Sequence, residues 1–419
     1  MYVASTRGTA VPTGAGGRGG RTMRQGRVPA AVVAIGAVSL LTDVSAEMVI
    51  AFLPIYLLYT LQLGFAQFGL LDGLYNASTA MLRLVGGHLA DRFRRPKMVA
   101  MAGYGLSAVT KLVFPAVGAS TVGVGAVLAV DRAGKGLRTA PRDALISFAV
   151  PPEQLGRAFG VHRAMDTAGA MLGPLLTFAL LANLGSGPGP VFVVSFCFAL
   201  LGLVVLACFV RERPGAVLAA SAGPISVRAA AGLLRGRSLR RVTIAAGLLG
   251  AATVSDAFVF VLLQREAGVP LGVLPLFPVG TAVVFLLAAA PLGRLADRVG
   301  RWPVFLAGHL LLLGVYLLLL VPAGGTAVVV AVLVLHGLFY AATDGVLMAI
   351  GAALVPAELR GSGLAVVQTA PALARLGSSV AFGFLLAAMA MGPAVGIAAI
   401  ALAVALVSAV LVVGREVAR

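Results

Sequence analysis

The sequence predicts an all-α membrane protein with twelve transmembrane helices in two six-helix, pseudo-symmetric bundles. Its 419 residues are 60% hydrophobic and 11% charged, whereas soluble domains are about 45–50% apolar and about 25% charged. Apolar stretches recur along the whole chain, and each is long enough to cross the roughly 30 Å hydrocarbon core of a bilayer. The two halves of the chain also resemble each other. These three observations exclude a soluble domain carrying a single anchor.

Twelve apolar segments account for the predicted helices, since a helix needs about 20 apolar residues to span a bilayer. In order, they are residues 30–58, 67–90, 98–117, 121–149, 158–183, 190–210, 242–263, 270–292, 303–321, 325–354, 363–389 and 393–413.

The charged residues between the spans predict the topology. Residues 1–27 form a flexible basic tail with five arginines and no acid, and Met23 is a possible alternative start. Arginine-rich stretches recur after even-numbered spans, as in 91–97 and 293–301, whereas the links after odd-numbered spans are almost uncharged. Because Lys and Arg collect in cytoplasmic loops, we expect both termini in the cytoplasm. The first span is too long for a cleaved signal peptide.

An internal repeat relates the two halves. "GGHLADRFRRPK" (86–97), after the second span, matches "PLGRLADRVGR" (291–301), after the eighth. "VLAVDRAG" (127–134), in the fourth span, matches "VLVLHGLF" (332–339), in the tenth. Parallel repeats of this kind predict a transporter whose binding site lies between the halves.

The repeat sets the expected domain organisation. Residues 28–210 and 242–413 form the two bundles, and residues 211–241 form a cytoplasmic linker with seven arginines and one acid. Such a basic linker is expected to lie on the anionic inner leaflet of the membrane. Residues 414–419 are predicted to be a short cytoplasmic tail.

The fourth span carries more charge than any other. Its stretch "DRAGKGLRTAPRDALI" covers residues 131–146. Residues at i, i+4, i+7 and i+11 share one helical face, and here these are Asp131, Lys135, Arg138 and Arg142. An ionisable group near mid-bilayer costs about 2.5–3.5 kcal/mol, so such groups face the bundle interior. The stretch therefore predicts a polar ladder that begins at Asp143 and enters the bundle.

Short motifs at corresponding places in the two halves resemble signatures of the major facilitator superfamily. The loop after the second span supplies Gly87, Asp91, Arg92 and Arg95, with Arg94 where the family usually has glycine. The loop after the eighth span supplies the full pattern, in Gly293, Asp297, Arg298, Gly300 and Arg301.

Two further motifs lie within spans. Arg132, Lys135 and Gly136 match the fourth-span signature of the family. Gly169, Gly173 and Pro174 match the fifth-span signature of its proton antiporters, although Thr177 and Phe178 stand where two glycines are usual. Together the motifs resemble a bacterial subgroup of presumed efflux permeases, similar to drug:proton antiporters.

This resemblance implies that spans one, four, seven and ten line a central cavity. The residues expected there, for proton coupling or substrate binding, are Asp43, Glu47, Asp131, Arg132, Lys135, Arg138, Asp256, His336, Tyr340 and Asp344. The loop residues, together with Asp143, are expected to act as gates that latch the outward-facing state. Plain positive-inside anchoring is the alternative for the basic loop residues, and close helix packing is the alternative for the fifth-span glycines.

Two interpretations of the buried charges stay open. In one, the charges pair to hold the helices in register. In the other, conformational change makes and breaks pairs and so moves a proton, because burial raises the pKa of a carboxyl group and a nearby arginine lowers it. The candidates for this second role include Asp43, Glu47 and Asp131. Asp256 and Asp344 are expected to contact a cationic substrate or to carry a second proton.

We expect a secondary transporter of the bacterial plasma membrane that exports a small molecule by proton antiport. Two alternatives are an uptake symporter for a sugar or metabolite and a non-transporting membrane sensor or scaffold. The expected partners are a substrate, protons and an anionic inner leaflet, with no nucleic acid, and the protein is expected to be a monomer. The sequence shows no catalytic triad, phosphate loop or metal-ligand spacing, so we expect neither an enzyme nor a cofactor.

Overall fold

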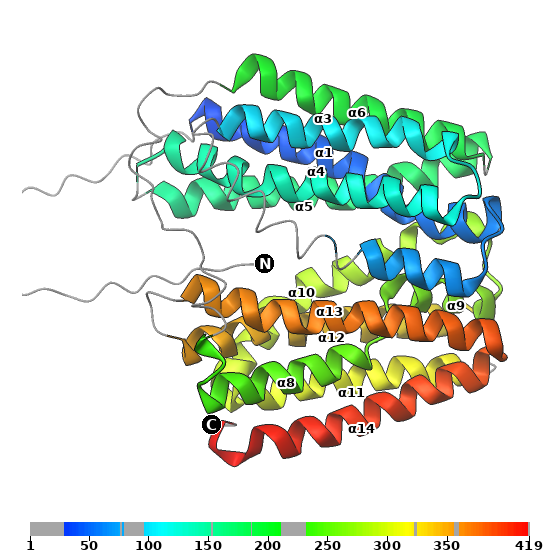
Figure 1. Ribbon diagram of the computed structural model, residues 1–419, viewed down its shortest axis with the longest axis vertical. Helices are drawn as coiled ribbons and strands as arrows, with labels where there is room; N and C mark the ends of the chain where they lie inside the picture. Colours follow the sequence, from blue (N-terminus) through cyan, green and yellow to red (C-terminus); the bar gives the residue numbers. More distant parts are fainter. Residues whose placement is uncertain are drawn as a thin grey trace, which may run out of the picture.

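The computed structural model describes residues 29–75, 78, 96–151, 154–185, 187–210, 232–321, 325–355 and 360–417. Within these residues the chain is helical and contains no strand. The long helices lie side by side in two groups, stacked one above the other in Figure 1. The predicted tail 1–27, most of the predicted linker and the end of the predicted C-terminal tail lie outside the described residues.

The first group is built from helices of the first half of the chain. They are α1 (Ala30–Ile55), which continues into a π-helical turn, η1 (Tyr56–Thr60), and then α3 (Pro96–Ala116), α4 (Thr121–Ala149), α5 (Leu155–Leu184) and α6 (Pro188–Phe209). In this group α1 packs on α5 and α6, and α3 packs on α4 and α6.

The second group is built from the second half. It contains α8 (Arg237–Ala251), α9 (Asp256–Ala267), the 3₁₀ turn η4 (Leu271–Val273), α10 (Leu276–Val299), α11 (Arg301–Leu320), α12 (Thr326–Leu354), α13 (Arg360–Ala388) and α14 (Met391–Val417). Here α12 packs on α10 and α11, and α8 packs on α13 and α14. Near the end of α14, Gly414 leaves helical geometry with a φ of 65°.

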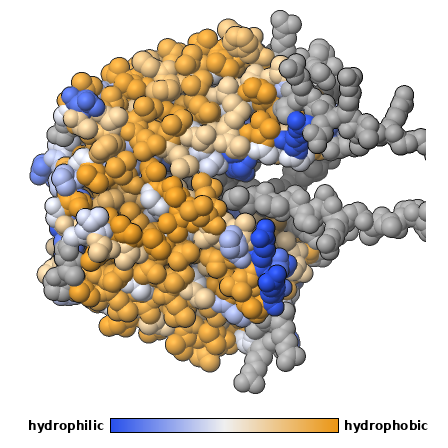
Figure 2. Space-filling view, turned by 180° about the vertical axis from the view of Figure 1, so that it is seen from behind, coloured by the Kyte–Doolittle hydropathy of each residue, from blue (hydrophilic) through white to orange (hydrophobic). Residues whose placement is uncertain are grey.

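The helices have the dimensions and surface of membrane spans. Ten helices in the described part of the chain are long and apolar enough to cross a bilayer. The predicted fourth span, α4, is a 29-residue helix. It is not one of these ten helices because it contains too many charged residues. The predicted second span is described only in part, as a helix over residues 65–75. Figure 2 shows a hydrophobic surface over the body of the molecule, with hydrophilic residues mainly toward its ends.

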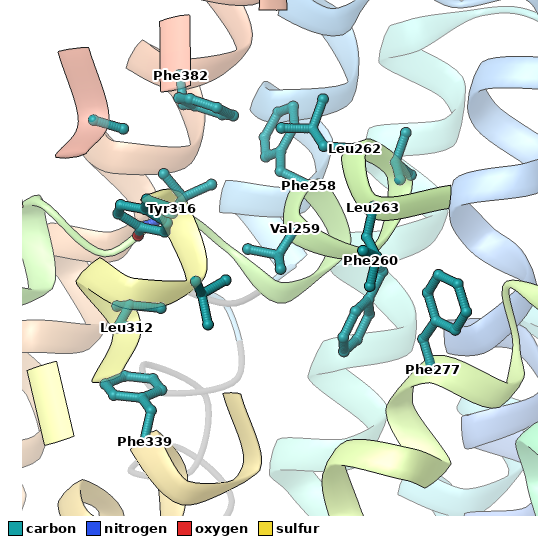
Figure 3. Packing of buried hydrophobic residues seen from close by; sticks show 14 of the residues in the cluster. Phe258, Val259, Phe260, Leu262, Leu263, Phe277, Leu312, Tyr316, Phe339 and Phe382 are labelled. Carbon is teal, nitrogen blue, oxygen red and sulfur yellow. The ribbon is translucent and has the colours of Figure 1, made fainter. Parts of the chain in front are cut away.

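The span predicted at 242–263 is present, but its helix is interrupted in the middle. The helix ends at Ala251, and α9 starts only at Asp256. The buried side chain of Tyr316, on α11, provides the missing hydrogen bonds. Its hydroxyl oxygen accepts from the Val254 N–H at 2.7 Å and its hydroxyl lies 3.4 Å from the Ala252 carbonyl oxygen. A break inside a membrane is tolerated when buried partners satisfy the freed backbone in this way. Figure 3 shows Tyr316 beside this break.

The two groups meet at the end of the molecule that we call the charge-poor end, on the right of Figure 1. It is formed by the described parts of the links after odd-numbered spans, residues 61–64, 117–120, 185, 187, 268–270 and 389–390. Phe258, on α9, lies at the centre of this contact. Its ring packs edge-on against Phe68 at 4.9 Å and against Phe382 of α13 at 5.1 Å. The opposite end, which carries the basic links, is the basic end.

The helix over 65–75 belongs to the first half in sequence but lies against α13 of the second half. A Cβ placed on Gly383 would lie 3.1 Å from the Gly69 Cα, so small residues allow the two backbones to approach closely. One turn deeper, the Ser379 hydroxyl donates to the Asp72 carboxylate at 2.8 Å, and both residues are buried. This polar contact fixes one half of the molecule against the other.

Candidate functional site

Close packing between α3 and α4 positions the most deeply buried charges. A Cβ on Gly134 would lie 2.7 Å from the Gly103 carbonyl oxygen, and a Cβ on Gly103 would lie 2.7 Å from the Gly134 carbonyl oxygen. Glycine at both positions therefore lets the two helix backbones touch. As a result, polar residues one and two turns along α3 reach the carboxylate of Asp131 on α4.

Asp131 accepts hydrogen bonds from four side chains. Three come from α3: Lys111 Nζ at 2.5 Å, Ser107 Oγ at 2.6 Å and Thr110 Oγ1 at 3.1 Å. The fourth donor is the neighbouring Arg132, whose guanidinium also donates to the Tyr75 hydroxyl at 2.8 Å. The side chains of Asp131, Lys111 and Arg132 are only 2–3% exposed. With four donors, the Asp131 carboxylate is fully hydrogen-bonded. This arrangement favours the interpretation in which buried charges hold the helices in register.

A second network joins α1, α4 and α5. Asp43 on α1 lies 3.6 Å from Arg138, and Asp166 on α5 lies 3.7 Å from Arg142. Helices α1 and α5 pack against each other, so the like charges of the two carboxylates repel. Two neighbouring carboxylates favour the binding of a proton by one of them unless basic groups compensate their charge. This pair is therefore a place where the bundle can hold a proton.

The glycines of the fifth-span motif hold α5 against the acidic face of α1. A Cβ on Gly173 would lie 2.8 Å from the Glu47 Cβ, and one on Gly169 would lie 3.0 Å from the Leu40 Cα. Pro174 is buried beside them. Because Asp166, Gly169 and Gly173 are spaced i, i+3 and i+7, they share this face of α5. The motif residues therefore pack α5 against the segment of α1 that carries Asp43 and Glu47.

Lys135 and Glu47 extend the same network toward the charge-poor end. Both side chains are partly buried. Lys135 interacts electrostatically with Asp43 and with Glu47. Two acidic side chains of α1 therefore face a row of basic side chains of α4. The predicted ladder on α4 is thus divided between two sets of partners. Asp131 and Arg132 face α3 and Tyr75, and Lys135 and Arg142 face α1 and α5. Arg138 contacts both sides, because it lies 3.6 Å from Asp43 of α1 and stacks over the Tyr104 ring of α3 at 4.5 Å.

The second half has a smaller polar cluster centred on Asp256, the first residue of α9. The Tyr340 hydroxyl donates to Asp256 Oδ1 at 2.6 Å, and His336 Nε2 lies 3.4 Å from the same oxygen. His336 is fully buried among aromatic rings, with Phe260 edge-on at 5.4 Å. The structure therefore brings together three of the four predicted residues of spans seven and ten. Asp344, the fourth, is exposed one turn further along α12.

A cavity of about 200 Å³ opens beside Asp256. Its wall comes from α9, α10 and α12 and consists of Asp256, Phe260, Pro278, Thr281, Ala282, Phe285 and Tyr340. Figure 3 shows Phe260 lying close to Phe277, which places this part of α9 against α10. Concave sites of this kind, apolar with a few polar groups, are where small molecules bind.

The predicted gate residues are only partly covered by the structure. Gly87, Asp91, Arg92 and Arg95 lie outside the described residues. In the second loop, Arg301 lies 3.3 Å from Asp297 and donates to the Ala349 carbonyl oxygen of α12 at 3.0 Å. Arg298 is exposed in the last turn of α10, and Gly293 has open space around it. Asp143 pairs with its neighbour Arg142 at 2.9 Å.

Sequence reasoning missed several residues that the structure adds. Asp166 is not among the residues predicted to line the cavity, although its i, i+3, i+7 spacing with Gly169 and Gly173 is a signal that it shares their face of the fifth span. Ser107 and Thr110 gave no signal, because hydroxyl residues are common in membrane helices. The cavity residues Thr281 and Phe285 lie on a span with no charge near the site, so periodicity alone could not select them.

Known proteins resemble this chain over most of its length. A model of the Major Facilitator Superfamily matches residues 35–379. An uncharacterized MFS-type transporter of Methanocaldococcus jannaschii is 28% identical over 363 residues, which is 84% of this chain and 88% of that protein. An uncharacterized protein of Mycobacterium tuberculosis is 41% identical over 122 residues, 29% of this chain and 30% of that protein.

Solved structures support the twelve-helix fold. The nucleoside transporter NupG superposes with a TM-score of 0.81 at 13% identity, covering 92% of this chain and 100% of that one. A POT family transporter in complex with 5-aminolevulinic acid superposes with a TM-score of 0.73 at 14% identity, covering 93% and 97%. The fold predicted from the sequence is thereby confirmed. The protein is a multi-pass membrane transporter, and its chain belongs to the Major Facilitator Superfamily.

Proposed function

We propose that the protein is a proton-coupled secondary transporter that exports a small molecule from the cytoplasm by alternating access. The observation that carries the proposal is the pairing of two acids on the packed helices α1 and α5, Asp43 and Asp166, with two arginines of α4. Asp43 lies 3.6 Å from Arg138, and Asp166 lies 3.7 Å from Arg142. Whether one of the two acids holds a proton therefore depends on how close the arginines are.

Movement of α4 relative to α1 and α5 supplies the coupling. With Arg138 and Arg142 close, negative charge on the two acids is compensated and a proton can leave. When the arginines move away, two adjacent carboxylates repel each other and one must take up a proton. Alternation between these arrangements would exchange a proton for each reorientation of the two halves.

The direction of transport rests on the fifth helix. Its antiporter-like motif packs directly behind the α1 segment that bears Asp43 and Glu47, with Gly173 against Glu47. A motif that sets the spacing of the acids would act on coupling, which supports antiport. The proposal also includes an inner-membrane location with both termini in the cytoplasm. The structural neighbours include a nucleoside transporter and POT family transporters, and uptake by symport is the competing outcome of the test.

The test uses inside-out membrane vesicles from an efflux-deficient bacterial host that expresses the full chain. Compounds to which expression confers resistance are added after respiration has established a pH gradient, which acridine orange fluorescence reports. We expect such a compound to restore fluorescence, and Asp43→Asn or Asp166→Asn to abolish that response. Glu266→Gln is the control, because Glu266 is exposed at the far end of α9.

Two results would contradict the proposal. Transport that continues at full rate after an ionophore has dissipated the gradient would exclude proton coupling. Substrate-dependent alkalinisation of the medium by intact cells would indicate uptake together with protons, and hence symport.

A further inference from the structure

The wall of the cavity beside α9 contains one charged group among the described residues. This is the carboxylate of Asp256, whose side chain is 44% exposed to the cavity. Both of its contacts, with Tyr340 and His336, use Oδ1, so Oδ2 is available to a ligand. The Tyr340 hydroxyl holds the carboxylate in one orientation. A fixed and accessible carboxylate oxygen in a low-dielectric site is a receptor for a positive charge.

The remainder of the wall is largely apolar and aromatic. Phe260 and Phe285 face the cavity together with the ring of Tyr340. The faces of aromatic rings attract cations, and more strongly when water is excluded. An ammonium group carried on an apolar body therefore matches both kinds of surface.

Thr281 provides an independent observation. It is 7% exposed, lines the cavity, and its Oγ1 has no hydrogen-bond partner among the described residues. A buried hydroxyl left unpaired is unfavourable, because it has lost its hydrogen bonds to water. A ligand N–H or O–H group that reaches this oxygen would satisfy it, so the hydroxyl is a candidate polar contact in the cavity wall.

The size and charge of the cavity narrow the class of ligand. At about 200 Å³ it is smaller than the roughly 300–1,000 Å³ of sites for drug-sized molecules. The nearby cationic side chain, Arg375, interacts electrostatically with Asp256 and lies 6.0 Å from the Tyr340 ring, but it is not part of the wall. A bound anion would meet Asp256 without a cationic partner in the wall, which the desolvation cost of charge disfavours.

We propose that this cavity binds a compact organic cation, an amine on an aromatic or apolar body, and that this cation is the transported substrate. The assignment as transported substrate rests on the proposed function, whereas the binding does not. The amine lies against Asp256 Oδ2 with a hydrogen bond to Thr281, and its apolar body contacts Phe260 and Phe285.

The test measures binding to the detergent-purified full chain by isothermal titration calorimetry, with three probes of similar shape. Phenethylamine carries a positive charge, 2-phenylethanol is neutral and 3-phenylpropanoate is negative. We expect phenethylamine to bind at least tenfold more tightly than either of the others. Asp256→Asn should remove that preference, and Thr281→Val should weaken amine binding several-fold. Glu266→Gln, on the same helix, should leave binding unchanged.

The outcomes separate this proposal from the proposed function. Preference for 3-phenylpropanoate, no binding of phenethylamine, or amine binding that is unchanged in both Asp256→Asn and Thr281→Val would each overturn it. If Asp256→Asn does not fold, Thr281→Val and Phe285→Ala decide the matter. Binding is measured without a pH gradient, so a failure of proton coupling in vesicles leaves this result unaffected.

Discussion

At the scale of single residues, Asp131 and Asp43 look alike in the sequence and differ in the structure. Both are acids in spans that were expected to line the cavity. Asp131 accepts from four donors and is almost completely buried, whereas Asp43 is 13% exposed and lies 3.6 Å from one arginine. The first is suited to holding helices together, and the second to changing partners.

Replacing Asp131 should therefore cost stability. In Asp131→Asn, the buried ammonium of Lys111 loses its counter-charge, and breaking a buried pair in this way costs about 3–5 kcal/mol. We expect a clear fall in the melting temperature of the purified protein, which Lys111→Met in the same chain should partly reverse. Asp143→Asn is the matched control, since that side chain is 44% exposed. A melting temperature unchanged in Asp131→Asn would argue against the structural role.

Sequence alone could select these acids but could not separate their roles. The i, i+4, i+7, i+11 spacing correctly indicated a continuous polar face on the fourth span. The division of that face depends on what α3 and α5 bring to it, and Lys111, Ser107 and Asp166 lie 20 to 35 positions from Asp131. Helical periodicity carries no information about which neighbouring helix a face will meet.

At the scale of helices, glycines set the distances on which the buried pairs depend. The α3–α4 crossing places Gly103 and Gly134 backbone to backbone. The α1–α5 contact uses Gly169 and Gly173 in the same manner. Membrane helices associate through small residues because apolar side chains gain little by leaving lipid.

Gly103→Ala should consequently destabilise the protein, because the added methyl group would lie 2.7 Å from the Gly134 carbonyl oxygen. Overpacking of this kind costs about 1–3 kcal/mol. Gly247→Ala is the control: Gly247 lies within α8 with open space around it, and alanine there should be neutral or stabilising by up to about 1 kcal/mol. Thermal unfolding in detergent compares the two, and equal melting temperatures would refute the packing argument.

The break between α8 and α9 could not be predicted from the sequence. Hydropathy is continuous through it, so the sequence predicts one helix. The chain leaves helical geometry because Tyr316, 62 residues away from Val254, accepts the hydrogen bond that the helix would have made. The pair Ser255 and Asp256 is a local signal for a helix start, but within an apolar span that signal is weak.

At the scale of the whole molecule, the internal repeat predicted the plan of the fold but not its chemistry. His336 occupies the position of Asp131 in the repeat. Asp131 accepts from bases of the first half, whereas His336 faces an acid, Asp256. The two halves share helix packing, but the acid at the central position of the first half is replaced in the second half by a histidine that faces an acid. The sequence therefore sufficed for the architecture, while the side-chain partners required the structure.

The charge-poor end is held closed by contacts of Arg265 near the end of α9. Its guanidinium donates to the Tyr59 hydroxyl at 3.1 Å and stacks over the Phe65 ring at 4.7 Å. The Tyr59 hydroxyl in turn donates to Gln264 at 3.1 Å. We refer to Tyr59, Phe65, Gln264 and Arg265 as the aromatic latch, since they connect the two halves.

Arg265→Ala should open this end more often. We expect faster labelling of a cysteine introduced by Thr281→Cys with a membrane-impermeant thiol reagent added from the charge-poor side, in a chain where Cys197 and Cys208 are replaced by Ser. Glu266→Ala, at the adjacent exposed position, is the control. Labelling at the original rate in Arg265→Ala would show that the aromatic latch does not contribute to closure.

Helix α9 carries Asp256 at its first residue and Arg265 in its last turn, about 14 Å apart at roughly 1.5 Å per residue. Because α9 is a short helix with a ligand-binding group at one end and the aromatic latch at the other, a movement of one end also moves the other. Any ligand that binds Asp256 more tightly when the latch is open must favour opening, and weakening the latch must raise the affinity for that ligand. Measured in the same variants, the binding constant and the labelling rate would therefore rise together.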